Sequence, residues 1–113
     1  MSITIRELIY ESHSIAISKG WWDTHRGIPE LLALVHSEVS EALEAYRIKG
    51  DTNLHDAWES ETGKPEGFAF ELADVLIRIA DMCGKLELDL DSAIQKKMAF
   101  NQTRSYRHGQ KKA

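Results

Sequence analysis

The chain has 113 residues, enough for one hydrophobic core but not for two independent domains. Its composition (42% hydrophobic, 28% charged) is typical of a soluble globular protein, and no apolar run approaches the roughly 20 residues of a membrane span. The net charge of −4 combines an acidic body with a basic C-terminal end, which argues against a duplex DNA binder. We therefore expect a cytoplasmic protein with no membrane and no duplex nucleic acid among its partners, and we place the single cysteine, Cys83, in the core.

Hydrophobic periodicity predicts two helices in the first half of the chain. The first covers approximately residues 3–19 and stops at Gly20, where helix-breaking glycine follows the last apolar position. A loop with the sequence GWWDTHRG follows. The second helix begins near Pro29, a residue favoured in the first turn, and ends at Gly50. Its apolar positions form an unusually wide face.

The second half predicts two more helices separated from the first pair by a polar segment. Residues 51–65 indicate a loop, with a short helical turn around 54–60 and no strand. The third helix runs from about residue 66 to 86. The fourth has Asp89 or Asp91 as its N-cap and extends to about residue 104.

Four helices with short connections indicate an all-α, four-helix bundle. The wide apolar faces of the two central helices favour assembly as a homodimer or homotetramer, because one copy alone does not cover both faces. We expect residues 1–108 to form a single domain. Residues 109–113 are expected to form a flexible basic tail.

Two pairs of acidic residues stand out on the central helices. Glu38 and Glu41 are three residues apart on the second helix, and Glu71 and Asp74 repeat this spacing on the third. Each pair borders the apolar stripe of its helix, so antiparallel packing would bring four carboxylates together. Four negative charges in a partly dehydrated place require cations. The pattern therefore predicts a metal site formed by both helices.

The predicted ligands are all carboxylate oxygens, which favours Mg²⁺ or Mn²⁺ over zinc or copper. The Glu-x-x-His motif of ferritin-like di-iron bundles is absent from both helices. Magnesium commonly completes its coordination shell with water and substrate phosphates. The expected substrate is therefore a polyphosphate ester.

The paired motif resembles the hallmark of the MazG-type, all-α nucleoside triphosphate pyrophosphohydrolases, which include dCTP pyrophosphatase and dimeric dUTPase branches. That hallmark is E-x-x-E followed on the next helix by E-x-x-D. The resemblance covers about residues 5–108 and extends to further positions in the first and last helices and in the first loop: His13, Trp22, Lys97, Asn101 and Arg104.

The resemblance implies Mg²⁺-dependent hydrolysis of a (deoxy)nucleoside triphosphate to the monophosphate and pyrophosphate, in sites formed by a dimer or tetramer. It makes Lys97 and Arg104 phosphate ligands and Asn101 a sugar or phosphate ligand. It makes Trp22 the residue that stacks on the base, with His13 a polar contact. Alternatives are a phosphoribosyl-ATP pyrophosphohydrolase and a non-catalytic helical dimerisation or nucleotide-sensing module.

The sequence departs from the family pattern at three places. The 29 residues between the two acidic pairs (42–70) exceed the usual gap, so residues 51–65 look like an added lid or specificity loop. Many relatives carry an acid, sometimes the general base, where this chain has Ser37, which leaves Glu38 or Glu41 as the candidate base. Arg78 stands where some dCTP-specific relatives have an aromatic residue, which weakens the case for a dCTP preference.

Overall fold

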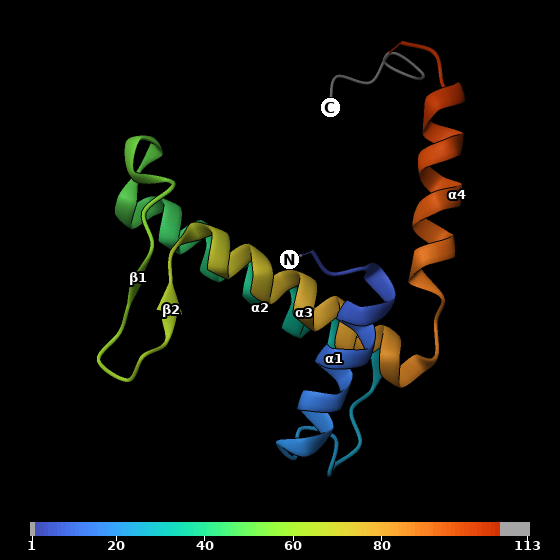
Figure 1. Ribbon diagram of the computed structural model, residues 1–113, viewed down its shortest axis with the longest axis horizontal. Coiled ribbons are helices and arrows are strands. Elements are labelled where there is room, and N and C mark those ends of the chain that lie inside the picture. Colours follow the sequence, from blue (N-terminus) through green and yellow to red (C-terminus); the bar gives the residue numbers. More distant parts are fainter. Residues whose placement is uncertain (1, 107–113) are drawn as a thin grey trace.

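The computed structural model describes residues 2–106, and the predicted domain boundary at residue 108 and the tail 109–113 lie outside this part of the chain. Within it, the protein is mostly helical, which confirms the all-α class (Figure 1). The elements in chain order are α1 (Ile5–Ser18), α2 (Ile28–Lys49), the 3₁₀ helix η1 (Asp51–Asn53), β1 (Trp58–Glu59), β2 (Pro65–Glu66), α3 (Phe68–Leu86) and α4 (Leu90–Thr103).

The helix ends lie within about two residues of the predicted ones because local capping sets them. Thr4 caps α1: its side chain accepts a hydrogen bond from the backbone N–H of Glu7, and the Glu7 carboxylate accepts one from the backbone N–H of Thr4. Asp89, one of the two predicted N-caps, accepts from the backbone N–H of Ser92 at the start of α4. Gly50 follows α2 with a φ of 75°, a value that glycine adopts without strain.

The prediction for residues 51–65 was wrong in two respects. The helical turn lies at Asp51–Asn53 rather than around 54–60, and the segment contains a small antiparallel hairpin in which Trp58 pairs with Glu66. Strands of two residues are too short to show an alternating pattern in the sequence. Gly63, with φ of 83°, allows the chain to reverse between the strands.

Helix α3 is the centre of the molecule, since both α1 and α2 pack along it, whereas α4 stands away from the α2–α3 pair and contacts chiefly α1 (Figure 1). Gly84 allows α1 to approach α3 closely, because a Cβ atom there would lie 2.6 Å from the Cβ of His13. Arg6 on α1 holds the start of α4 through Asp91, with its Nε 3.0 Å from a carboxylate oxygen.

The core of a single copy is small. Among the described residues, the buried hydrophobic side chains are Ala16, Leu31, Ala42, Ala80 and Cys83, which confirms the placement of the cysteine. The solvent-accessible surface of 9068 Å² compares with about 6300 Å² for a compact monomer of this mass. Many large apolar side chains of the described residues are exposed, among them Leu32, Val39 and Leu43 on α2. In the part of the chain that the structure describes, no helix is long and apolar enough to cross a membrane.

Candidate metal centre

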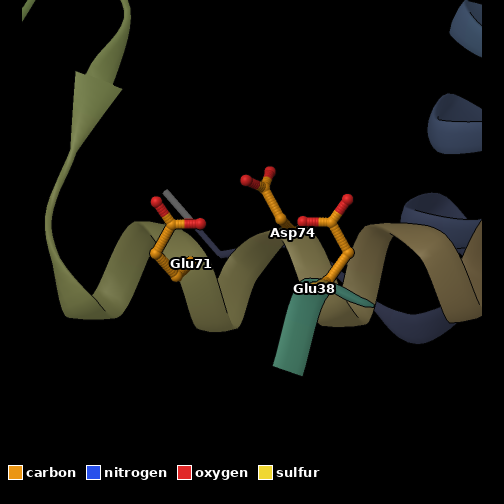
Figure 2. Close-up of side chains that lie close together, drawn as sticks. All are labelled: Glu38, Glu71 and Asp74. Atoms are coloured by element: carbon orange, nitrogen blue, oxygen red, sulfur yellow. The ribbon is translucent and has the colours of Figure 1, made fainter. Parts of the chain in front are cut away.

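The structure brings together three of the four predicted carboxylates. Helices α2 and α3 run antiparallel, since Glu38 bonds to Arg78 late in α3 while Ile48, near the end of α2, shares a cavity with Glu71 near the start of α3. Glu38, Glu71 and Asp74 each offer an oxygen atom, and these atoms lie within 4.8 Å of one another. Figure 2 shows all three carboxylates on the same side of α3, with Glu38 reaching in from α2 beside Asp74.

Glu41, the fourth predicted ligand, lies outside this triad but next to it. A hydrogen bond between the Glu41 and Glu38 carboxyl groups, reinforced by the charge of Glu38, raises the pKa of Glu41. Its side chain is exposed and lines the cavities on both sides of the cluster. Glu41 is therefore placed to exchange a proton with solvent or a bound molecule beside the triad.

The two α3 carboxylates are held in an environment that disfavours their charge. Burial, followed by the charge of Asp74, raises the pKa of Glu71. Burial, followed by the charge of Glu38, raises the pKa of Asp74. Lys64 opposes both shifts, and Arg78 also opposes that of Asp74. The nearby positive charges thus offset only part of the burial and repulsion, and a bound cation would relieve the remainder.

The triad fits a hard divalent cation in both chemistry and spacing. Oxygen ligands at about 2.0–2.1 Å from Mg²⁺ lie about 3–4 Å from one another, so small side-chain rotations from the present separations suffice. Three carboxylates also leave coordination positions for water and phosphate oxygens. A zinc or copper site would be expected to include histidine or cysteine, and none belongs to this group.

Arg78 orients the α2 member of the triad. Its Nε donates to Oε1 of Glu38 at 3.1 Å, and the Glu38 side chain is only 13% exposed. Arg78 lies one helical turn beyond Asp74, so the guanidinium sits at the edge of the cluster. Glu38, held in this way by Arg78, also offers an oxygen atom to the triad.

A cavity of about 370 Å³ opens beside the cluster. Its lining combines four acidic residues, two basic residues and an apolar wall. These residues are Glu38, Glu41, Asp74, Asp81, Lys64, Arg78, Trp21, Ile15, Ile77, Ala16 and the polar Ser12. A second cavity of about 250 Å³ lies next to Glu41 and Glu71. The larger one offers an apolar surface and a cation-binding surface to the same ligand.

His13 and Trp22, predicted to contact substrate, both contact Asp81 on α3. His13 Nδ1 lies 2.8 Å from Asp81 Oδ1, and Trp22 Nε1 donates to the same oxygen at 2.9 Å. Neither residue lines the cavities. The neighbouring Trp21 does, with 53% of its surface exposed and the guanidinium of Arg26 5.3 Å from its ring centroid.

The three substrate-binding residues predicted on α4 lie away from the cluster in a single copy. Lys97, Asn101 and Arg104 are exposed, and neither cavity is lined by residues of α4. The Arg104 guanidinium lies 5.1 Å from the ring centroid of Phe100 on its own helix. These residues can reach a carboxylate cluster only if α4 moves or if a second copy supplies it.

Two charged residues of the cavity, Asp81 and Lys64, were not among the residues predicted from the sequence. Asp81 stands seven positions after Asp74, a helical spacing that puts both on one side of α3 and could have identified it. Lys64 gave no such signal, because its place beside the carboxylates depends on the hairpin between α2 and α3.

Comparisons with known proteins gave no significant match: no protein-family model, no curated protein and no solved structure matches the chain.

Proposed function

We propose that the protein is a Mg²⁺-dependent nucleoside triphosphate pyrophosphohydrolase that releases the monophosphate and pyrophosphate. The observation that carries this proposal is the all-oxygen triad of Glu38, Glu71 and Asp74, whose oxygen atoms lie within 4.8 Å of one another and of which Glu38 and Asp74 line a cavity of about 370 Å³. Ligand groups of this kind select a hard cation, and such cations bind phosphate oxygens. The MazG-like spacing of the two acidic pairs supports the same reaction.

The proposed role of each side chain follows from its position in the site. The triad would hold Mg²⁺, which supplies neutralisation of phosphate charge and a bound water of lowered pKa. Glu41, beside the triad and with a raised pKa, would accept the proton of the water that attacks the α-phosphorus. Trp21 would stack on the base, a contact worth about 1–3 kcal/mol in nucleic-acid binders.

We propose further that the active form contains at least two copies. Exposed apolar side chains at helical spacing line α2, and Leu72 and Leu76 extend the apolar surface onto α3. The α2 stripe consists of Leu32, Val39, Leu43 and Tyr46. Burial of this stripe in an interface would stabilise the fold, and a second copy would bring an α4 with Lys97, Asn101 and Arg104 towards the cluster.

The direct test of catalysis is a panel of deoxyribo- and ribonucleoside triphosphates, with phosphoribosyl-ATP included, incubated with protein and Mg²⁺. The expected products are the monophosphate and pyrophosphate rather than orthophosphate. Asp74→Asn and Glu41→Gln should lose activity, whereas Glu30→Gln, an exposed acid at the start of α2 that lines neither cavity, should retain it. Absence of hydrolysis of every nucleotide, or equal activity in Asp74→Asn, would refute the enzyme.

Assembly is tested separately by light scattering coupled to size exclusion. We expect a mass of two or four chains for the unmodified protein. Leu43→Glu places a charge in the exposed α2 stripe and should lower the mass, because burying that charge is unfavourable. Glu44→Lys, one position along but on the solvent side, serves as the control and should leave the mass unchanged. A monomer at all concentrations would overturn this part of the proposal.

A further inference from the structure

The hairpin between α2 and α3 is anchored at both of its ends. Trp58 in β1 lies under Lys49 at the end of α2, with the ammonium 4.4 Å from the ring centroid, and its Nε1 donates to Glu66 at 3.1 Å. Gly67 joins β2 to α3 and is buried against the carbonyl of Asp56, where a Cβ atom would lie at 2.5 Å. The hairpin therefore enters α3 in a defined position at the Glu71 end of the cluster (Figure 2).

This arrangement carries Lys64, at the start of the second hairpin arm, to the carboxylates. Its backbone is fixed across the turn, since Ser60 N–H donates to the Lys64 carbonyl at 2.9 Å and the Lys64 N–H donates to Ser60 Oγ at 3.2 Å. The side chain lines both cavities, the larger one with Glu38, Glu41 and Asp74 and the smaller one with Glu41 and Glu71. It is thus the basic residue common to the two cavities.

Lys64 faces these acids without pairing with them. Among residues 2–106, no carboxylate oxygen lies within 4.0 Å of its ammonium group, whereas Arg78 on the other side is bonded to Glu38. Its positive charge nevertheless lowers the pKa of Glu41, Glu71 and Asp74 relative to what burial and repulsion would produce. The ammonium is close enough to act on the cluster and far enough away to leave room between them.

We propose that Lys64 is a phosphate-binding residue of this site and contacts the pyrophosphate part of the substrate from the side opposite the triad. This inference rests on the proposed function and deepens it, because it assigns a role to the hairpin that the acidic motifs do not include. A phosphate group held between a carboxylate-bound cation and an ammonium satisfies both partners, and lysine on a flexible stem suits a point contact of this kind.

The competing role for Lys64 is compensation of the acidic charge alone. The two roles predict opposite effects of removing the ammonium on polyphosphate binding. A phosphate contact predicts weaker binding of a polyphosphate in the presence of Mg²⁺. Pure compensation predicts equal or tighter binding, because the triad would then hold Mg²⁺ more strongly.

The experiment measures binding of inorganic tripolyphosphate and of orthophosphate by calorimetry in the presence of Mg²⁺. These probes contain no base, so they report on the phosphate end of the cavity only. The full-length chain is compared with Lys64→Met, with Lys64→Arg, which keeps the charge, and with Lys96→Met, an exposed lysine on α4. Thermal melting of each variant establishes that it is folded.

We expect Lys64→Met to weaken tripolyphosphate binding about tenfold or more, as for loss of a charge-assisted hydrogen bond. Lys64→Arg should retain most of the affinity, Lys96→Met should match the unmodified chain, and orthophosphate should bind weakly to all four. Unchanged or tighter tripolyphosphate binding by Lys64→Met would overturn the inference. Failure of the proposed function is recognised separately, by the absence of nucleotide hydrolysis in the unmodified protein.

Discussion

Two aspartates on α3, two helical turns apart, have opposite surroundings. Asp81 accepts a hydrogen bond from Trp22 and pairs with His13, both at one oxygen and both from elements outside α3. Asp74 has no hydrogen-bond donor among the described residues and faces Glu38 and Glu71 instead. The chain satisfies the first carboxylate internally and leaves the second without a hydrogen-bond donor among the described residues. The comparison separates a carboxylate that holds helices together from one that is available to a ligand.

The largest effect is expected from removing the unsatisfied carboxylate. Asp74→Asn should lower kcat/KM at least about 100-fold, since even partners one shell beyond a metal ligand contribute 10–100-fold. The same variant should not lower the melting temperature in the absence of metal, because it removes a repelling charge. Steady-state kinetics and thermal melting with and without Mg²⁺ measure both quantities. If Asp74→Asn were fully active but had a lower melting temperature, Asp74 would be a structural residue and not one that is available to a ligand.

The second effect concerns the packing that brings donors to Asp81. Gly84→Ala introduces a Cβ atom 2.6 Å from the Cβ of His13 and should push α1 away from α3. We expect a loss of about 1–3 kcal/mol in the free energy of unfolding, although alanine normally stabilises a helix interior by up to about 1 kcal/mol. Urea unfolding at one fixed protein concentration measures the change, with Ser14→Ala on the exposed side of α1 as the control. A stabilised Gly84→Ala would show that α1 does not pack here.

A smaller effect is expected when Asp81 itself is neutralised. Asp81→Asn keeps the shape of the side chain but weakens its bonds to His13 and Trp22, so the free energy of unfolding should fall by about 1 kcal/mol. The rise in melting temperature with Mg²⁺ should persist, because the triad is unchanged. Thermal melting across a Mg²⁺ titration checks this. Loss of the Mg²⁺ response in Asp81→Asn would place Asp81 in the metal site.

The carboxylate cluster that contains Asp74 could be predicted from the sequence, because it depends on the spacing of residues within helices. The spacing of Glu38 and Glu41, and of Glu71 and Asp74, together with antiparallel packing of two periodic helices, is sufficient to bring acids from both helices together. The capping residues also placed the helix ends within about two residues. Local rules therefore predicted the unsatisfied cluster well.

The contacts of the Asp81 carboxylate and the position of Lys64 could not be predicted in this way. The contacts of Asp81 with His13 and Trp22 depend on how closely α1 approaches α3, which is a property of the tertiary structure. Adjacent Trp21 and Trp22 have the same residue type, so the sequence alone does not tell which packs and which lines the cavity. Lys64 reaches the acids through a hairpin whose two-residue strands leave no periodic signal.

The smallest effect is the pH dependence of stability without metal. The pKa values of Glu71 and Asp74 are raised in the folded state above 4.5 and 3.8, so between these values and the folded pKa values the native state binds more protons than the unfolded state. The free energy of unfolding should therefore increase as pH falls through this window, and the gain should be lost as pH rises through it. Asp74→Asn should flatten the slope, because it removes one of these two carboxyl groups. The increase in melting temperature caused by Mg²⁺ should have the opposite pH dependence. It should be largest at neutral pH and disappear at low pH, because protons and the cation compete for the same oxygens. Melting temperatures from pH 4.5 to 7.5, with and without Mg²⁺, measure both slopes, and parallel curves would mean that the triad does not bind the ion.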